Sequence, residues 1–275
     1  MNFNEKILKA TQKNQSVMCI GLDPDPKLMP DHLSVLDFNR AIIEATADLV
    51  CAYKPNIAFY EALGTTGLEI LAQTRKIIPP DIPVIIDAKR GDIGNTSAAY
   101  ASALFDIFGF DAATVNPYLG FDALEPFIKY ADKGVFILCR TSNPGAEDFQ
   151  SLICVFQSRT RPLFEIVAER AKEWNTRGNI GLVVGATYPE ELKLLRQQHP
   201  HLPLLIPGVG TQGGDVGLTV KYGLGHEEGK MIINSSRQIL YASRGSDFAE
   251  AARKAARNLR DEMNRFRAEQ PPKYS

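Results

Sequence analysis

The feature that most constrains the fold is a repeated alternation of short apolar runs with longer amphipathic segments. Eight apolar runs have the length and composition of buried strands, at residues 16–22, 50–53, 83–88, 112–115, 135–139, 180–184, 202–206 and 231–233. Helical periodicity follows in segments 36–49, 67–78, 95–108, 121–131, 162–175, 189–199, 213–221 and 248–265. Alternating strands and helices form parallel sheets, and a run such as 84–86 is apolar on both faces. The pattern predicts an α/β fold around a buried parallel sheet.

Periodicity leaves two architectures open for such a sheet. Eight strands favour a closed (β/α)8 TIM barrel, whereas an open, doubly wound sheet shows the same alternation. No linker or low-complexity segment divides the chain, so we expect one domain over residues 1–275, with a frayed tail at about 266–275. Residues 142–161 form the longest stretch without a predicted element.

Composition excludes several partners. The 31 Lys and Arg residues nearly balance the 32 Asp and Glu residues, so there is no general field for nucleic acid or an anionic membrane. No run of about 18 apolar residues is present to span a bilayer, and the N-terminal residues lack an apolar signal core. The four cysteines, Cys19, Cys51, Cys139 and Cys154, contain no CxxC pair. We therefore expect reduced thiols and a cytoplasmic protein.

The segment of residues 87–96, DAKRGDIGNT, carries the most chemical information. It follows a strand, so Asp87 and Lys89 should point to the same side and Arg90 to the other. Asp92 follows at the start of a helix, where Asn95 is a plausible N-cap. A lone Asp-x-Lys would most often be a minor surface ion pair. Several charges at the carboxyl end of a buried strand, where barrel enzymes place their catalysts, instead indicate a site.

A second region suits a phosphate group. Barrel enzymes often bind phosphate with the loops after strands seven and eight. The first of these loops contains Gly208, Gly210, Gly213 and Gly214, whose N–H groups we expect to be accessible to an anion. Such a glycine cluster alone usually marks only a turn. Arg237 in the other loop adds a forked cation suited to phosphate and favours the functional interpretation.

Other candidate residues are weaker. We expect 116–118, Asn-Pro-Tyr, to line the pocket floor mainly by packing. The four histidines, His32, His199, His201 and His226, form no metal-like cluster in the sequence, and His199 and His201 should be solvated loop residues. The sequence has no GxSxG motif, no P-loop and no GxGxxG after its first strand.

Read together, these motifs resemble the orotidine 5′-phosphate decarboxylase family, and DAKRGDIGNT resembles the form found in its second sequence subgroup. The matches follow the family's order at successive strand ends: 21–23 (GLD), Lys54, 87–96, 140–145 (RTSNPG), 207–214 (PGVGTQGG) and 234–237 (NSSR). The resemblance implies a (β/α)8 barrel and not an open sheet. It also implies decarboxylation of orotidine 5′-phosphate to UMP and CO2, the last step of de novo pyrimidine nucleotide synthesis, without cofactor or metal.

The resemblance also implies the residues that act. Lys54, Asp87, Lys89 and Asp92 would form a charge array of alternating sign, with Asp92 supplied by the second subunit of a homodimer. The Lys89 ammonium would stabilise negative charge developing at C6 of the pyrimidine and then deliver its proton there. Asp87 would lie near the departing carboxylate, either repelling it or only orienting Lys89.

The remaining family positions would bind the substrate. Asp23 resembles the residue that hydrogen-bonds a ribose hydroxyl, although an aspartate before Pro24 is equally a turn former. Lys54 would also bind the ribose, and Thr96 would reach it across the dimer interface. Ser142 would read the pyrimidine edge, with Thr141 as the adjacent alternative. The other expected substrate-binding residues are Ile93, Pro207, Gly208, Gln212 and Arg237, with Gln212 closing over the phosphate.

Two other functions share parts of this pattern. A magnesium-dependent decarboxylase or aldolase acting on keto-sugar phosphates shares Asp-x-Lys-x-x-Asp but has a glutamate at the end of its second strand, where this chain has Lys54. A barrel that binds a nucleotide or protein without catalysis should lack one of the four charged residues, and all four are present. The chain is longer than compact family members, mainly at 147–161 and at the C-terminal end.

Overall fold

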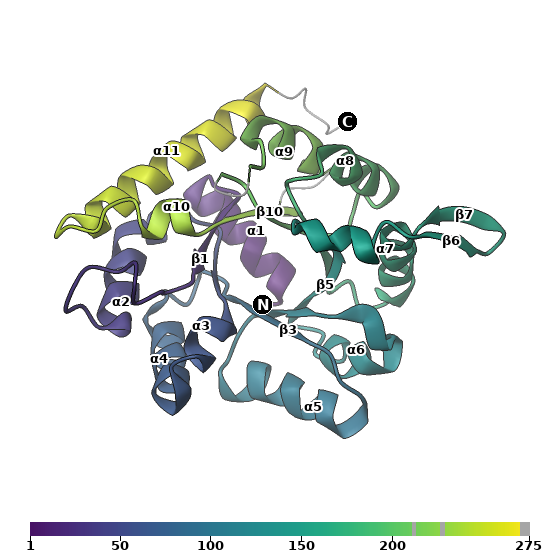
Figure 1. Cartoon of the computed structure of the whole chain (residues 1–275), viewed down its shortest axis with the longest axis horizontal. Coiled ribbons are helices and arrows are strands. Elements are labelled where there is room, and N and C mark those ends of the chain that lie inside the picture. The colour runs from purple at the N-terminus through teal and green to yellow at the C-terminus, as the bar shows by residue number, and fades with distance from the viewer. Residues whose placement is uncertain (211–212, 226–228, 270–275) are drawn as a thin grey trace.

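In the computed structural model, which describes residues 1–210, 213–225 and 229–269, the strands surround a central axis and the helices lie outside them (Figure 1). The sheet has the strand order β2-β1-β10-β9-β8-β5-β4-β3, and all of its neighbouring strands are parallel. Its strands are β1 (Met18–Leu22), β2 (Ala52–Pro55), β3 (Ile85–Arg90), β4 (Ala112–Val115), β5 (Gly134–Arg140), β8 (Ile180–Val184), β9 (Leu204–Pro207) and β10 (Met231–Ser235).

The two ends of this sheet meet and close it. Parallel bridges join Tyr53 to Val84 and Asn56 to Asp87, and the Tyr53 N–H donates to the Pro83 carbonyl at 3.1 Å. Closure removes the free edges that an open sheet would expose. The predicted (β/α)8 barrel is confirmed, and the eight predicted strands agree with the observed ones to within two residues at each end.

The helices follow the strands and cover the outside of the barrel (Figure 1). They are α2 (Val35–Thr46), α3 (Ile57–Glu61), α4 (Gly64–Ile77), α5 (Gly94–Ser102), α6 (Phe121–Ile128), α7 (Leu163–Trp174), α8 (Pro189–Gln198), α9 (Val216–Gly223), α10 (Arg237–Leu240) and α11 (Phe248–Ala268). The described residues also form three short 3-10 helices, η1 (Ala47–Leu49), η3 (Pro117–Leu119) and η4 (Pro144–Asp148), and one π-helical turn, η2 (Ala103–Ile107). The predicted helix 95–108 is therefore divided between α5 and the π-helical turn η2.

An N-terminal helix that the strand and helix pattern did not predict plugs the barrel. Helix α1 (Phe3–Asn14) begins with a capping box between Asn2 and Glu5, which satisfies backbone N–H groups of its first turn. Phe3 and Ile7 pack with the inward-facing side chains of the strands, among them Phe136. This apolar cluster closes the amino-terminal end of the barrel, so a ligand can enter only at the carboxyl ends of the strands.

The segment predicted to lack regular structure contains a β-hairpin. Strands β6 (Ile153–Phe156) and β7 (Arg159–Pro162) pair antiparallel and project from the barrel wall (Figure 1). The turn residues Gln157 and Ser158 both have positive φ, 49° and 61°, as a two-residue hairpin turn requires. Neither residue is the glycine or asparagine that usually marks such a turn, so the sequence concealed it.

Two further expectations were wrong. Helix α11 continues to Ala268, and Phe266 packs on the core, so residues 266–268 are not a frayed tail; residues 270–275 lie outside the described part. His199 is 6% exposed, against the expected solvated position, because it is the C-cap of α8 and lies close to Lys172 and Glu169 of α7. His201 is exposed as expected, and His226 lies outside the described residues.

All four cysteines are free thiols. Cys19, Cys51 and Cys139 are buried free thiols, and Cys154 in the hairpin is partly exposed. Burial raises the pKa of the Cys51 thiol to about 12, which keeps it protonated and unreactive. Among the described helices, none is both long and apolar enough to cross a membrane.

Candidate active site

A cavity of about 680 Å³ opens at the carboxyl ends of the strands, opposite the plug formed by α1. This volume is in the usual range for a small-molecule site. Its floor is the layer of inward-facing side chains directly above the apolar barrel interior. Because side chains alternate along a strand, the residue two places after an interior residue faces the cavity. Thus Ala52 is followed by Lys54, Ile85 by Asp87 and Ile232 by Asn234.

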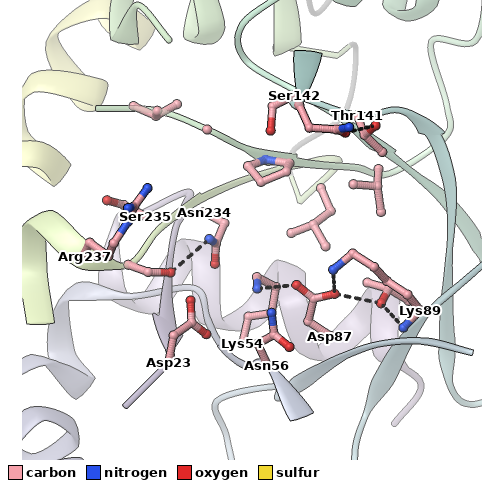
Figure 2. Close-up of a pocket in the computed structure, with 18 of the residues that line it drawn as sticks. Asp23, Lys54, Asn56, Asp87, Lys89, Thr141, Ser142, Asn234, Ser235 and Arg237 are labelled. Atoms are coloured by element: carbon pink, nitrogen blue, oxygen red, sulfur yellow. Dashed lines mark hydrogen bonds and ion pairs between the residues drawn. The ribbon is translucent and has the colours of Figure 1, made fainter. Parts of the chain in front are cut away.

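The centre of the floor is a row of three ion-paired groups (Figure 2). The Lys54 Nζ donates to Asp87 Oδ2 at 2.8 Å, and the Lys89 Nζ donates to Asp87 Oδ1 at 2.5 Å. The Lys54 and Asp87 side chains are only 5% and 12% exposed, whereas that of Lys89 is 48% exposed and reaches the open cavity. The prediction that Asp87 and Lys89 face the same way is confirmed.

The electrostatics of this row keep its buried members charged. Burial favours the neutral form of Asp87, but the opposing charges of Lys54 and Lys89 outweigh it and hold the pKa of Asp87 well below its usual range. Burial likewise favours neutral Lys54, but the charges of Asp87 and then Asp23 outweigh it and raise the pKa of Lys54 above its ordinary value. A carboxylate and a buried ammonium are therefore both present at neutral pH.

The backbone and a neighbouring strand fix Lys89 in place. Lys89 has φ +48°, a left-handed conformation that is uncommon for residues other than glycine and is concentrated at functional sites. The pairing of β3 with β4 is irregular at this point, between Ile86 and Arg90. Thr114 on β4 accepts from the Lys89 N–H at 3.0 Å and donates to Asp87 Oδ1 at 3.0 Å. Thr114 thus holds both charged residues, a role that the sequence did not indicate.

Arg90 points away from the cavity, as the alternation predicted. Its guanidinium pairs with Glu61 of α3 and lies over the Tyr100 ring of α5. It therefore joins the helices that flank β3 and leaves Lys89 as the only cation that β3 directs into the pocket.

The loop after β5 forms the wall opposite Asp23 and Lys54 (Figure 2). Thr141 and Ser142 both line the cavity there, so the structure keeps both as candidates for the pyrimidine edge. Gln150 holds this loop, since its Oε1 accepts from the Thr141 N–H at 2.8 Å and its Nε2 donates to the Thr141 hydroxyl at 2.9 Å. Gln150 also lines the cavity, and it belongs to the stretch for which no structure was predicted.

Arg140, the last residue of β5, anchors the same loop from behind. Its side chain is completely buried, it pairs with Glu147 and Glu191 at 2.5 Å each, and it lies 3.7 Å from the centre of the Tyr188 ring. Two carboxylates compensate the buried guanidinium, as burial of a charge requires. The arginine of the 140–145 motif is therefore structural and fixes the loop that carries Ser142.

The expected phosphate side contains Pro207, Gly208 and Arg237, all of which line the cavity. Arg237 is exposed and forms no ion pair with any residue that the structure describes, so its guanidinium is available to an anion. Gln212 lies outside the described residues.

The expectation that the loop glycines offer free N–H groups was partly wrong. The amides of Gly210, Gly213 and Gly214 donate to carbonyls of the same loop, at 3.3, 2.8 and 3.1 Å. Gly208 and Gly210 have φ values of +99° and +83°, which suit glycine. A Cβ on Gly214 would also lie 2.6 Å from the Gly208 carbonyl oxygen. These glycines allow the loop to fold back on itself, and the cation Arg237 remains the stronger anion-binding candidate.

Several predicted residues lie outside this cavity. Asp92, Ile93 and Thr96 at the start of α5 do not line it; Ile93 is 60% exposed, and Thr96 is also exposed. Ile93 rather than Asn95 is the N-cap of α5. The expectation that residues 116–118 line the pocket floor was wrong, because Asn116 is the N-cap of the turn η3, Pro117 and Tyr118 begin that turn, and Tyr118 is 82% exposed.

The cavity residues to which the sequence assigned no role include the polar side chains of Asn56, Thr114, Gln150 and Asn234. Strand alternation, the rule that joined Asp87 to Lys89, also selects Thr114 and Asn234, since each lies two residues beyond an interior residue of its strand. Asn56 directly follows β2, where strand-end position was a usable signal. Gln150 had none. Among the described residues, no group of three or more His, Cys, Asp or Glu side chains is placed to hold a metal ion.

Fold and site together define a (β/α)8 barrel with a charged ligand cavity at the carboxyl ends of its strands. Residues 16–255 match the model of the orotidine 5′-phosphate decarboxylase / HUMPS family, and the chain belongs to this family.

Relatives named orotidine 5′-phosphate decarboxylase agree over nearly the full length. One from Dehalococcoides mccartyi strain 195 is 56% identical over 97% of this chain and 99% of its own, and one from Thermomicrobium roseum is 54% identical over 98% and 97%. Among solved structures, Leishmania donovani OMP decarboxylase superposes with a TM-score of 0.85 at 38% identity, covering 98% of this chain and 100% of its own.

Proposed function

We propose that this protein decarboxylates orotidine 5′-phosphate to UMP and CO2. One observation carries the proposal: a lysine, an aspartate and a second lysine form a fixed, ion-paired row on the floor of the cavity. The family to which the chain belongs, and relatives more than 50% identical over almost its whole length, support the same activity.

In the proposed reaction, the bond between C6 of the pyrimidine and its carboxylate breaks, and the electron pair stays on C6. The Lys89 ammonium faces that carbon, stabilises the charge as it develops and then transfers a proton to it. Because this ammonium is held by Asp87 before the substrate arrives, little reorganisation is needed during the reaction. The side chain is 48% exposed, so the resulting amine can recover a proton from water between turnovers.

Lys54 and Asp87 prepare this step. Lys54 neutralises Asp87 from the side opposite Lys89, which allows the carboxylate to remain charged beside the substrate. Asp87 lies near the position of the departing carboxylate, where it either repels that group or only orients Lys89. A row that already contains two cations gives a divalent metal ion little electrostatic advantage, which favours this function over the magnesium-dependent alternative.

The ends of the nucleotide fit the two ends of the cavity. Arg237 supplies a guanidinium for the phosphate, next to Pro207 and Gly208, and Ser142 or Thr141 supplies polar atoms for the pyrimidine edge. Asp23 at the mouth of β1 binds the ribose between them. The phosphate contacts would use remote binding energy to hold the base against Lys89.

A second copy of the chain completes the site in this proposal. Asp92 and Thr96 lie outside the cavity of their own chain, on a surface where α5 and the turn η3 expose several apolar side chains. Tyr118 is 82%, Ile93 60% and Leu119 48% exposed there. Clustered exposed apolar residues mark association surfaces, and a symmetric dimer would place Asp92 and Thr96 in the partner's site. The free thiols suit a reducing compartment, so we place the enzyme in the cytoplasm.

The activity is tested by following loss of orotidylate absorbance with EDTA present, for the wild type and Lys89→Ala. We expect robust wild-type turnover and a loss of at least ~4 kcal/mol of transition-state stabilisation, about a thousandfold, in the variant. An alanine variant within tenfold of the wild type would refute the proposed proton donor. Wild-type activity that disappears with EDTA and returns with Mg²⁺ would favour the metal-dependent alternative.

Shared sites are tested by mixing two inactive variants, Lys89→Ala and Asp92→Ala. A randomly formed hybrid dimer has one site with both lesions and one intact site. Mixing should therefore restore about a quarter of wild-type activity. No recovery after subunit exchange, with hybrids demonstrated by mass, would show that Asp92 does not act in the partner's site.

A further inference from the structure

At one edge of the cavity, three buried side-chain oxygen atoms lack hydrogen-bond partners among the described residues. Asp23 Oδ1, Asn234 Oδ1 and Ser235 Oγ are fully shielded, and none has a hydrogen-bond partner among the residues that the structure describes. Asn234 is only 7% exposed. An unpaired buried polar atom costs about 1–3 kcal/mol, so such atoms at the wall of a ligand cavity indicate contacts that a ligand completes.

The fold places Asn234 beside Asp23. Both side chains border the Ser236 hydroxyl: the Asn234 Nδ2 lies 3.4 Å from Ser236 Oγ, and a Cβ on Gly21 would lie 1.8 Å from the same oxygen and 3.1 Å from Asp23 Oδ2. The Asn234 side chain faces inward, because Asn234 lies two residues after the barrel-interior residue Ile232 on the same strand. In Figure 2, Asn234 lies between Arg237 and Lys54, next to Asp23.

We infer that Asn234 is a further substrate-binding residue, whose side-chain carbonyl accepts a hydrogen bond from a ribose hydroxyl of the nucleotide. This inference rests on the proposed function. In Figure 2, Asn234 lies between Arg237, which is assigned to the phosphate, and the row of Lys54, Asp87 and Lys89, which contains the lysine assigned to the base. The sugar of a nucleotide must lie between its phosphate and its base.

The chemistry of the two free acceptors supports a sugar there. A carboxylate oxygen and an amide oxygen side by side both require donors. The phosphate and carboxylate of orotidine 5′-phosphate offer only acceptors when ionised, whereas neighbouring ribose hydroxyls offer two donors at adjacent carbons. The Asn234 Nδ2 donates to Ser236 Oγ at 3.4 Å, so the amide oxygen is the group of this side chain that still lacks a partner among the described residues.

The neutral amide also suits the charge balance of the site. Asp87 and Asp23 both lie near Lys54, and both raise its pKa against the effect of burial. A third carboxylate at position 234 would add a negative charge beside a doubly anionic phosphate ester. Asparagine supplies the acceptor without that charge.

The test compares Asn234→Ala with the wild type on orotidine 5′-phosphate and on its 2′-deoxy and 3′-deoxy analogues. With the full substrate, kcat/KM should fall between about fivefold and about 150-fold, since a ribose hydroxyl loses its buried acceptor. With the analogue that lacks the contacted hydroxyl, the same substitution should change kcat/KM by less than about threefold. Equal losses on all three substrates would overturn the inference and make Asn234 structural.

Two further variants keep the result interpretable. Ser142→Ala, on the pyrimidine side, should reduce kcat/KM by the same factor with all three substrates. If Asn234→Ala does not fold, Asn234→Ser replaces it in the comparison, because serine is small and retains a polar group on the strand. Should the wild type itself fail to decarboxylate orotidine 5′-phosphate, the proposed function fails; a substrate-independent loss in an active enzyme overturns only the role of Asn234.

Discussion

Thr114 offers the sharpest test of how the site is held, because one hydroxyl supports both charged residues of β3. In Thr114→Val the shape is almost unchanged, but the Lys89 N–H loses its acceptor and Asp87 loses a donor, each at 3.0 Å. A hydrogen bond to a charged group contributes about 1.5–3 kcal/mol, and a buried N–H left unpaired costs about 1–3 kcal/mol. Thr114 is 1% exposed, so water cannot readily replace the hydroxyl.

We therefore expect Thr114→Val to destabilise the protein by roughly 2–4 kcal/mol, seen as a fall of several degrees in melting temperature. The rate effect should be larger than stability alone explains. Displacement of a reacting group by about 1 Å can reduce a rate about 100-fold, so kcat should fall by about 10- to 100-fold at a temperature where the variant is folded.

The matched control is Thr114→Ser, which keeps the hydroxyl and removes one methyl group. It should lose about 1 kcal/mol of stability and keep kcat within about threefold of the wild type. Both variants are measured by thermal melting and by steady-state decarboxylation. If the valine variant turns over as fast as the serine variant, the Thr114 hydroxyl does not position Asp87 and Lys89, and the reasoning is refuted.

Two other perturbations test separate parts of the structure. Arg237→Ala should lower kcat/KM by about 10- to 150-fold, from loss of charge-assisted bonds to phosphate, and leave the slow rate on orotidine without phosphate unchanged; an equal loss on both substrates would contradict a phosphate role. Burial, followed by the charge of Lys172, lowers the pKa of His199, whose ring nitrogens have no partner among the described residues. Arg161 and Arg196 act in the same direction and Glu169 opposes them. The unfolded chain therefore binds this proton more readily, so stability should decline as the pH falls below about 6.5, and His199→Leu should flatten that decline. Asp87 affects stability only at lower pH. Its pKa is depressed in the folded state, so its stabilising contribution is lost as the pH falls below about 4. Parallel melting curves for wild type and His199→Leu between pH 5 and 7 would exclude His199 as the cause.

The sequence determined those features that local periodicity encodes. Alternation of side chains along a strand assigned Asp87 and Lys89 to one face and Arg90 to the other, and the structure confirms both. Eight buried strands between amphipathic helices favoured the barrel, and the family resemblance implied it. The same resemblance, at successive strand ends, predicted Asp23, Lys54 and Arg237, all of which line the cavity. The assignment of faces along β3 needs only the order of residues within one strand.

Tertiary structure decided which elements meet. Thr114 supports Asp87 from a neighbouring strand, and Asn234 pairs with Cys19 of β1 although more than two hundred residues separate them in sequence. The burial of His199 and the contact of Gln150 with Thr141 likewise depend on how loops fold back on the barrel. The physical reason is that a closed parallel barrel brings distant strand ends into one layer. The distances within that layer are set by register and loop path, which the pattern of a single strand does not contain.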